Sequence, residues 1–116
     1  MEKTDLIAAL AALAQDNRLD VFRLLVQAGP EGLPAGQIAT ALGLPPNTLS
    51  FHFDRLRNAG LIAVRRDGRS MIYTARFDTM NGLVAYLTEN CCRGVSPDCA
   101  PKRTSTSSRT RIKEKT

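Results

Sequence analysis

The chain has 116 residues, 43% of them hydrophobic, and a formal net charge of +5. This length predicts one small globular domain, and three cysteines are too few for a disulfide scaffold. No apolar run reaches the roughly 18 residues of a membrane span, and the start of the chain lacks a signal-peptide pattern, so we expect a cytoplasmic protein.

The positive charge is unevenly distributed along the chain. Residues 1–92 carry nine basic and nine acidic side chains, so the whole excess lies in residues 93–116. Inside the neutral part, residues 45–76 carry six arginines against two aspartates. A basic segment within a neutral domain predicts a surface that binds a polyanion.

The first predicted elements are three helices. Thr4 or Asp5 caps an alanine-rich helix, whose small side chains permit close approach of another helix in a core or across a dimer. Asp16 or Asn17 caps a second helix with enough apolar residues to be mostly buried. A short third helix begins near Pro34, where proline costs no helical hydrogen bond.

A fourth helix is predicted from residue 45 to about residue 59, with Gly60 as its stop. Residues 61–64 and 70–75 form two strands, joined by a turn with an Asp67-Gly68 signature. Asp78 caps a fifth helix, which Gly94 ends. We therefore expect a mainly α fold with a β-hairpin wing (α+β), the winged helix–turn–helix, over residues 1–93, and a cysteine-containing turn with a basic disordered tail over residues 94–116.

The fourth helix is the candidate DNA-reading element. At 100° per residue, Leu49, Phe53 and Leu56 share one side and face the core. Phe51 lies on the opposite side, where its ring could contact a thymine methyl group. His52 lies on the boundary, where we favour a packing or hydrogen-bonding role over direct DNA contact. The wing arginines suit backbone phosphates or a narrow minor groove. The candidate DNA-binding residues are Asn47, Thr48, Ser50, Phe51, His52, Arg55, Arg65, Arg66 and Arg69.

Three segments carry a family resemblance. Residues 17–25 (NRLDVFRLL), 48–62 (TLSFHFDRLRNAGLI) and 69–73 (RSMIY) resemble the ArsR/SmtB winged-helix metalloregulators. The resemblance implies a homodimer built from the first and last helices, and a repressor that an effector releases from double-stranded operator DNA. The chain lacks the Cys-x-Cys pair that many arsenic-sensing members carry at the recognition region. It also lacks the last-helix histidines of zinc-sensing members, although Asp78 and Glu89 are present.

The cysteines are the candidate effector site. Cys91, Cys92 and Cys99 lie within nine residues, and three thiolates without a fourth ligand suit a three-coordinate thiophilic centre such as As(III) or Sb(III). Zinc would need a fourth ligand such as Asp98 or water. Cadmium, lead, Cu(I) and disulfide formation by an oxidant remain open, as does a plain packing role for the thiols. The predicted function is thus a transcriptional repressor released by metalloid binding.

Two other classes of protein fit parts of the sequence. A small thiol enzyme could use a vicinal cysteine pair, but the chain has no Cys-x-x-Cys motif or phosphate loop, so we expect no enzyme. An architectural nucleic-acid protein would depend on the basic tail, and deleting that tail would abolish its binding. If the chain instead binds an operator through Arg55 and the wing, the same deletion would only weaken its DNA binding.

Overall fold

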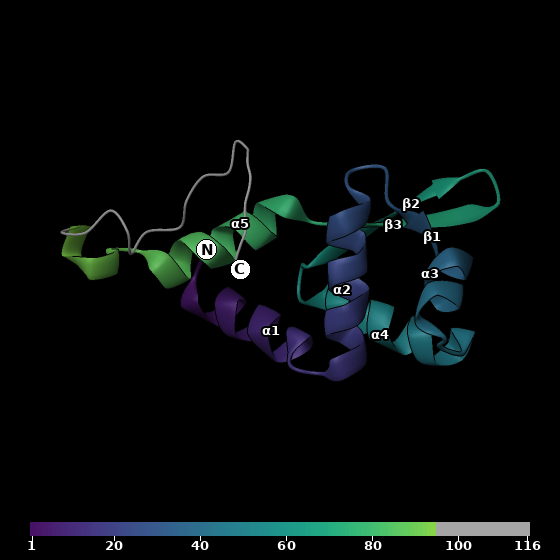
Figure 1. Cartoon of the computed structure of the whole chain (residues 1–116), viewed down its shortest axis with the longest axis horizontal. Helices are drawn as coiled ribbons and strands as arrows, with labels where there is room; N and C mark the ends of the chain where they lie inside the picture. Colours follow the sequence, from purple (N-terminus) through teal and green to yellow (C-terminus); the bar gives the residue numbers. More distant parts are fainter. Residues whose placement is uncertain (95–116) are drawn as a thin grey trace, which may run out of the picture. The chain divides into compact units, whose positions relative to one another are not determined.

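The computed structural model describes residues 1–94, and the chain divides into two compact units, Met1–Val84 and Ala85–Thr116. The first unit ends inside the fifth helix, before the composition change at residue 93. No helix in the described part of the chain has both the length and the apolar character needed to cross a bilayer. The elements in order (Figure 1) are α1 (Lys3–Leu13), α2 (Asp16–Ala28), β1 (Leu33–Pro34), α3 (Ala35–Leu42), α4 (Pro46–Asn58), β2 (Ile62–Asp67), β3 (Ser70–Ala75), α5 (Phe77–Thr88) and a 3-10 helix (Cys91–Gly94).

The core of the first unit is mainly aliphatic, with Phe22 and Phe53 as its aromatic members, and is centred on α2. This helix contacts α1, α3, α4 and β3, which explains why so many of its residues are apolar. Each fully buried Leu, Ile or Val is worth about 1.5–3 kcal/mol relative to an exposed one. The largest fully buried side chains are Val21, Leu25, Ile38, Leu49, Leu56 and Leu61.

The helices begin one to three residues away from the predicted caps. The N-cap of α1 is Glu2 rather than Thr4 or Asp5, and its side chain makes no capping hydrogen bond. The N-cap of α2 is Gln15, whose side-chain oxygen accepts a hydrogen bond from the backbone N–H three residues on, at 2.9 Å. Asp78 lies inside the first turn of α5. The acidic residues expected as caps therefore occupy first turns, where a negative charge favours the helix dipole.

The turn between α3 and α4 is short, and its shape is set by backbone conformation. Gly43 ends α3 in the left-handed region at φ +65°, a conformation that glycine adopts without steric cost. The backbone N–H of Leu44 then donates to the Ala39 carbonyl at 3.1 Å. Pro45 is extended, and Pro46 begins α4. These residues fix the angle at which α4 leaves α3 and so complete the helix–turn–helix.

The wing is longer than the sequence indicates. β2 runs to Asp67, and only Gly68 and Arg69 form the turn before β3. The register pairs Asp67 with Ser70 and Ile62 with Ala75. The hairpin extends beyond the helices (Figure 1), so side chains near its tip are accessible to a large partner.

A third strand was not predicted. β1 pairs antiparallel with β3 through Leu33↔Tyr73 and Pro34↔Ile72, which gives the sheet order β1-β3-β2. A strand of two residues has no alternating pattern that a sequence can reveal, and its proline suits only an edge position. β1 ties the segment before α3 to the base of the wing.

The last helix ends earlier than predicted. α5 stops at Thr88, and Asn90 adopts a left-handed conformation at φ +59°, which asparagine tolerates better than most residues. The expectation that Cys91 and Cys92 lie on this helix is therefore wrong, because both belong to the following 3-10 helix. The expectations for Cys99 and for the basic tail concern residues outside the described part of the chain.

Candidate nucleic-acid interface

The face of α4 opposite the core is polar and accessible. Leu49, Phe53 and Leu56 are 0–3% exposed, as predicted, and they fix the rotation of the helix about its axis. On the opposite face Asn47, Ser50, Phe51 and Arg55 are exposed, and Thr48 is half-buried. The Asn47 side-chain oxygen accepts a hydrogen bond from the Thr48 N–H at 3.0 Å. The helix thus presents short polar groups at its start and larger groups further along.

Phe51 and Arg55 contact one another on this face. They lie one helical turn apart, and the guanidinium carbon of Arg55 is 5.0 Å from the centre of the Phe51 ring, within the range of a cation–π interaction. The Phe51 side chain is 53% exposed. The sequence placed both residues on the outer face, but it gave no sign that their side chains meet.

His52 is the exception among the predicted DNA-binding residues. It is only 6% exposed, and its Nδ1 atom is buried without a hydrogen-bond partner in residues 1–94. Burial, followed by the nearby positive charge of Arg18, lowers the pKa of the imidazole. This position agrees with the packing interpretation, and a direct DNA contact by His52 stays a prediction that its 6% exposure does not favour.

The wing arginines differ in their surroundings. Arg65 and Arg66 lie on β2 rather than at the tip, and only Arg69 occupies the turn. The Arg65 guanidinium donates to the Glu31 carbonyl at 2.9 Å, which ties the wing to the loop before β1. Within the described residues, the side chains of Arg66 and Arg69 make no hydrogen bond or ion pair. These two side chains are therefore the wing groups most available for phosphates.

Two other arginines of the basic segment are paired with carboxylates. Arg57 lies 3.7 Å from Asp54 on α4, and Arg76 lies 3.1 Å from Asp78. Both pairs are exposed, so each contributes little to stability. Their effect is to reduce the local excess of positive charge and to concentrate it on Arg55 and the wing.

The cysteine pair forms the second candidate site. The sulfur atoms of Cys91 and Cys92 lie 3.5 Å apart. Adjacent residues of a regular helix point about 100° apart, but Cys92 has a left-handed conformation at φ +54°. Cys92 is disulfide-bonded in the structure. Among residues 1–94, no group of three His, Cys, Asp or Glu side chains converges as a metal site.

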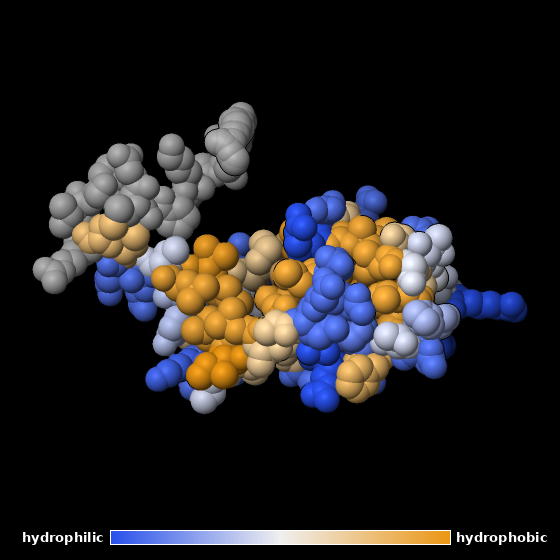
Figure 2. All heavy atoms as spheres, turned by 60° about the horizontal axis from the view of Figure 1, so that its bottom comes forward, coloured by the Kyte–Doolittle hydropathy of each residue, from blue (hydrophilic) through white to orange (hydrophobic). Residues whose placement is uncertain are grey.

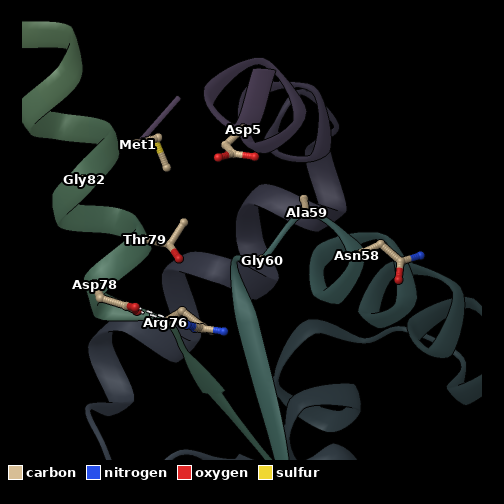
Figure 3. A pocket seen from close by; sticks show the side chains of 9 residues that line it. All are labelled: Met1, Asp5, Asn58, Ala59, Gly60, Arg76, Asp78, Thr79 and Gly82. Carbon is tan, nitrogen blue, oxygen red and sulfur yellow. Dashed lines mark hydrogen bonds and ion pairs between the residues drawn. The ribbon is translucent and has the colours of Figure 1, made fainter. Parts of the chain in front are cut away.

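A hollow of about 460 Å³ lies where the start of α1, the turn after α4 and the start of α5 meet (Figure 3). The Arg76–Asp78 ion pair lies at its edge, and the hydrogen bond from Arg76 is the main reason why the pKa of the Asp78 carboxyl is lowered. Asp5 and Thr79 also line it. Met1 brings one soft thioether sulfur to this hollow, but no cysteine or histidine lines it, so the hollow does not gather the thiolates that a three-thiolate centre needs.

Comparison with known proteins agrees with this geometry. A helix-turn-helix domain family model matches residues 13–65. The transcriptional regulator YgaV of Escherichia coli is 31% identical over 85 residues, which span 73% of this chain and 84% of that protein. An ArsR-like transcriptional regulator from a Rhodococcus species has the same fold, with a TM-score of 0.66 at 24% identity over 78% of this chain and 81% of that one.

A third similar protein adds the DNA-binding context. It is the homodimeric winged helix-turn-helix DNA-binding domain of a possible ArsR-family regulator from Mycobacterium bovis. It has a TM-score of 0.61 at 27% identity, over 78% of this chain and 83% of that domain. The fold, the accessible face of α4 and these similarities lead to one conclusion: the chain belongs to the ArsR/SmtB family of winged-helix transcriptional regulators.

Proposed function

We propose that this chain is a cytoplasmic, homodimeric transcriptional repressor that leaves its operator DNA when As(III) or Sb(III) binds Cys91, Cys92 and Cys99. The observation that carries the effector part of the proposal is the 3.5 Å separation of the Cys91 and Cys92 sulfur atoms. The DNA-binding part rests on the accessible face of α4 and on the wing.

DNA binding follows from the distribution of charge and shape. In this proposal α4 enters the major groove with its first turns, as the second helix of a helix–turn–helix does. Arg66 and Arg69 bind backbone phosphates beside it, because both are exposed and form no ion pair within the described residues. Phosphate contacts fix the position of the protein on DNA, and the groups on α4 read the sequence.

The dimer follows from an apolar surface on α1. Ile7 and Leu10 are 54% and 40% exposed, and Figure 2 shows hydrophobic side chains gathered over this helix. Exposed aliphatic side chains grouped in this way mark an interface. The similar domain from Mycobacterium bovis is a homodimer, so a second copy of this chain is the proposed occupant. Two copies present two α4 helices to half-sites in successive major grooves.

The effector site depends on the unusual backbone at Cys92. A metal–thiolate bond of about 2.3 Å lets two sulfurs on one ion lie up to about 4.6 Å apart. Cys92 is disulfide-bonded in the structure, so the separation of 3.5 Å describes the oxidised chain; after reduction, sulfurs at this separation would suit two thiolates on a single centre. Left-handed backbone at a residue other than glycine costs about 1–2 kcal/mol, and such strain is often retained where it serves a site. Soft sulfur ligands favour thiophilic ions over magnesium or calcium. Cys99 is the proposed third ligand.

Release from DNA is a linkage between two sites. Three thiols and arsenite combine to give one arsenic–trithiolate group and three water molecules. If this group forms more readily in the DNA-free dimer, metalloid binding weakens DNA binding by the same factor. A coupling of about 1–3 kcal/mol, or about 5- to 150-fold in affinity, is ordinary for such regulators.

An oxidant-sensing repressor is the second candidate, because Cys92 is disulfide-bonded in the structure. In this alternative an oxidant removes two electrons and two protons from a pair of thiols, and the resulting disulfide changes DNA affinity. Both candidates share the same fold and DNA interface. They differ in what the thiols react with.

The deciding experiment is native mass spectrometry of the fully reduced protein with and without arsenite. We expect one arsenic per monomer with loss of three protons, and release of a bound DNA duplex under the same conditions. Replacing any one of Cys91, Cys92 or Cys99 with serine should abolish release and leave DNA affinity unchanged. An absence of adduct on reduced thiols overturns arsenite as effector, and release by a disulfide-forming oxidant then supports the second candidate.

A further inference from the structure

The contact between Phe51 and Arg55 has a consequence for which bases the protein reads. Both side chains are exposed on the outer face of α4, and the guanidinium carbon lies 5.0 Å from the ring centre. In the described part of the chain, the Arg55 side chain donates no hydrogen bond and pairs with no carboxylate. The neighbouring Asp54 pairs instead with Arg57, at 3.7 Å. The Arg55 N–H groups therefore remain available to a ligand while ring contact orients them.

Phe51 itself is not part of the hydrophobic core. The core positions of α4 are occupied by Leu49, Phe53 and Leu56, whereas Phe51 is 53% exposed. Its ring meets the buried His52 imidazole edge-on, with centroids 5.9 Å apart at an angle of 61°. The Phe51 ring therefore lies between a buried side chain and an arginine.

The spacing of these two groups lets them reach neighbouring base pairs. Successive bases on one strand rise by about 3.4 Å along the DNA axis and also turn about it, so two groups 5.0 Å apart face adjacent bases when they are offset across the groove as well as along it. In the major groove, only thymine offers an apolar methyl group, and guanine offers two acceptors, O6 and N7, that match the arginine fork. An aromatic ring beside an arginine is therefore complementary to a thymine beside a guanine.

We propose that Phe51 and Arg55 act together to recognise adjacent T·A and G·C base pairs, with the Phe51 ring on the thymine methyl group and the Arg55 guanidinium on guanine O6 and N7. This inference rests on the proposed function, because it requires α4 to lie in the major groove. Ring contact orients Arg55 before DNA arrives, which reduces the conformational entropy lost on binding. Loss of Phe51 therefore weakens recognition of both bases.

The test begins with the operator sequence. Duplexes with random sequence are selected on the full-length reduced protein, and affinity for the enriched duplex is measured by fluorescence anisotropy. We expect the enriched sequence to contain adjacent T·A and G·C pairs. Replacing that thymine with uracil, which lacks only the methyl group, should weaken binding about fourfold, on the scale of one buried methyl group. In Phe51→Ala the uracil duplex should bind as well as the thymine duplex.

The arginine is tested on the neighbouring base pair. Arg55→Lys retains the charge but loses the two-pronged geometry, so discrimination between guanine and adenine should fall about tenfold. Arg57→Lys is the matched control, because Arg57 is an exposed arginine of the same helix paired with Asp54. It should leave discrimination unchanged. Phe51 is exposed, so circular dichroism should show that the alanine variant remains folded.

Two results overturn different parts of the reasoning. If the wild-type protein enriches no sequence, both the proposed DNA-binding function and this inference are wrong. If a sequence is enriched but Phe51→Ala keeps the full preference for thymine over uracil, the function stands and the inference is overturned. Equal discrimination by Arg55→Lys and wild type would also overturn it.

Discussion

Replacing Gly32 with alanine should release the edge strand from the wing. Gly32 precedes β1 and has φ +72°, in the left-handed region. A Cβ atom at this position would overlap the Tyr73 carbonyl oxygen and lie 2.5 Å from the Thr74 methyl group. The obstacle includes backbone of the central strand β3, so a change of rotamer cannot remove it. The chain before α3 has to move away from β3.

The expected cost can be worked from these contacts. A left-handed conformation costs alanine about 1–2 kcal/mol more than glycine. Separation of β1 from β3 disrupts the pairing of Leu33 with Tyr73, and each backbone hydrogen bond lost costs about 0.5–1.5 kcal/mol. The free energy of unfolding should therefore fall by about 2–4 kcal/mol, which lowers Tm by at least about 8 °C for a domain of this size.

Gly36→Ala is the matched control for this prediction. Gly36 lies in α3, and no atom lies within 4 Å of the Cβ that alanine would add. Because alanine favours a helix by up to about 1 kcal/mol over glycine, this variant should be unchanged or more stable. Both variants are compared by calorimetry and urea unfolding. Equal stability of Gly32→Ala and wild type would refute the reasoning from the close approach of Gly32 to β3.

Two further predictions concern the buried histidine and the apolar surface. Burial lowers the pKa of His52 below its unfolded value of about 6.5, so its contribution to stability is present above about pH 6.5 and is lost as pH falls below that. Between pH 7 and 5, Tm should fall more for wild type than for His52→Gln, and parallel pH profiles would contradict this. Ile7→Asp should convert the dimer to a monomer in sedimentation analysis, whereas Met71→Asp, at an exposed methionine of the wing, should not. A dimeric Ile7→Asp variant would exclude α1 as the interface.

The helical periodicity of the chain was enough to predict the helical part of the fold. Leu49, Phe53 and Leu56 recur at the spacing of one helical face, and burial follows that spacing directly. The glycine signals located the helix–turn–helix and the wing for a similar reason, because only a few residues adopt the backbone angles that such turns need. The predicted Asp67-Gly68 turn is wrong by one residue, because Asp67 pairs with Ser70 at the end of β2 and the turn is formed by Gly68 and Arg69. The predicted N-cap positions were less accurate, because several polar residues near the start of each helix can serve as caps.

Contacts between distant segments could not be predicted. The two-residue strand β1 exists because β3 offers it hydrogen bonds, and nothing within Leu33 and Pro34 marks them as a strand. Arg65 is tied to the Glu31 carbonyl, 34 residues away, although the sequence shows it only as one of several wing arginines.

Local sequence thus determined which residues of α4 face outward, since a helix fixes side-chain direction by 100° steps whatever surrounds it. Only the tertiary structure decided what those residues do there. It buries His52, whose boundary angle alone left its role open, and it brings Arg55 against the Phe51 ring. It also shows that α5 stops at Thr88, that Cys92 has a left-handed backbone, and that the sulfurs of Cys91 and Cys92 lie 3.5 Å apart. Such outcomes depend on neighbours and on backbone angles that residue periodicity does not encode.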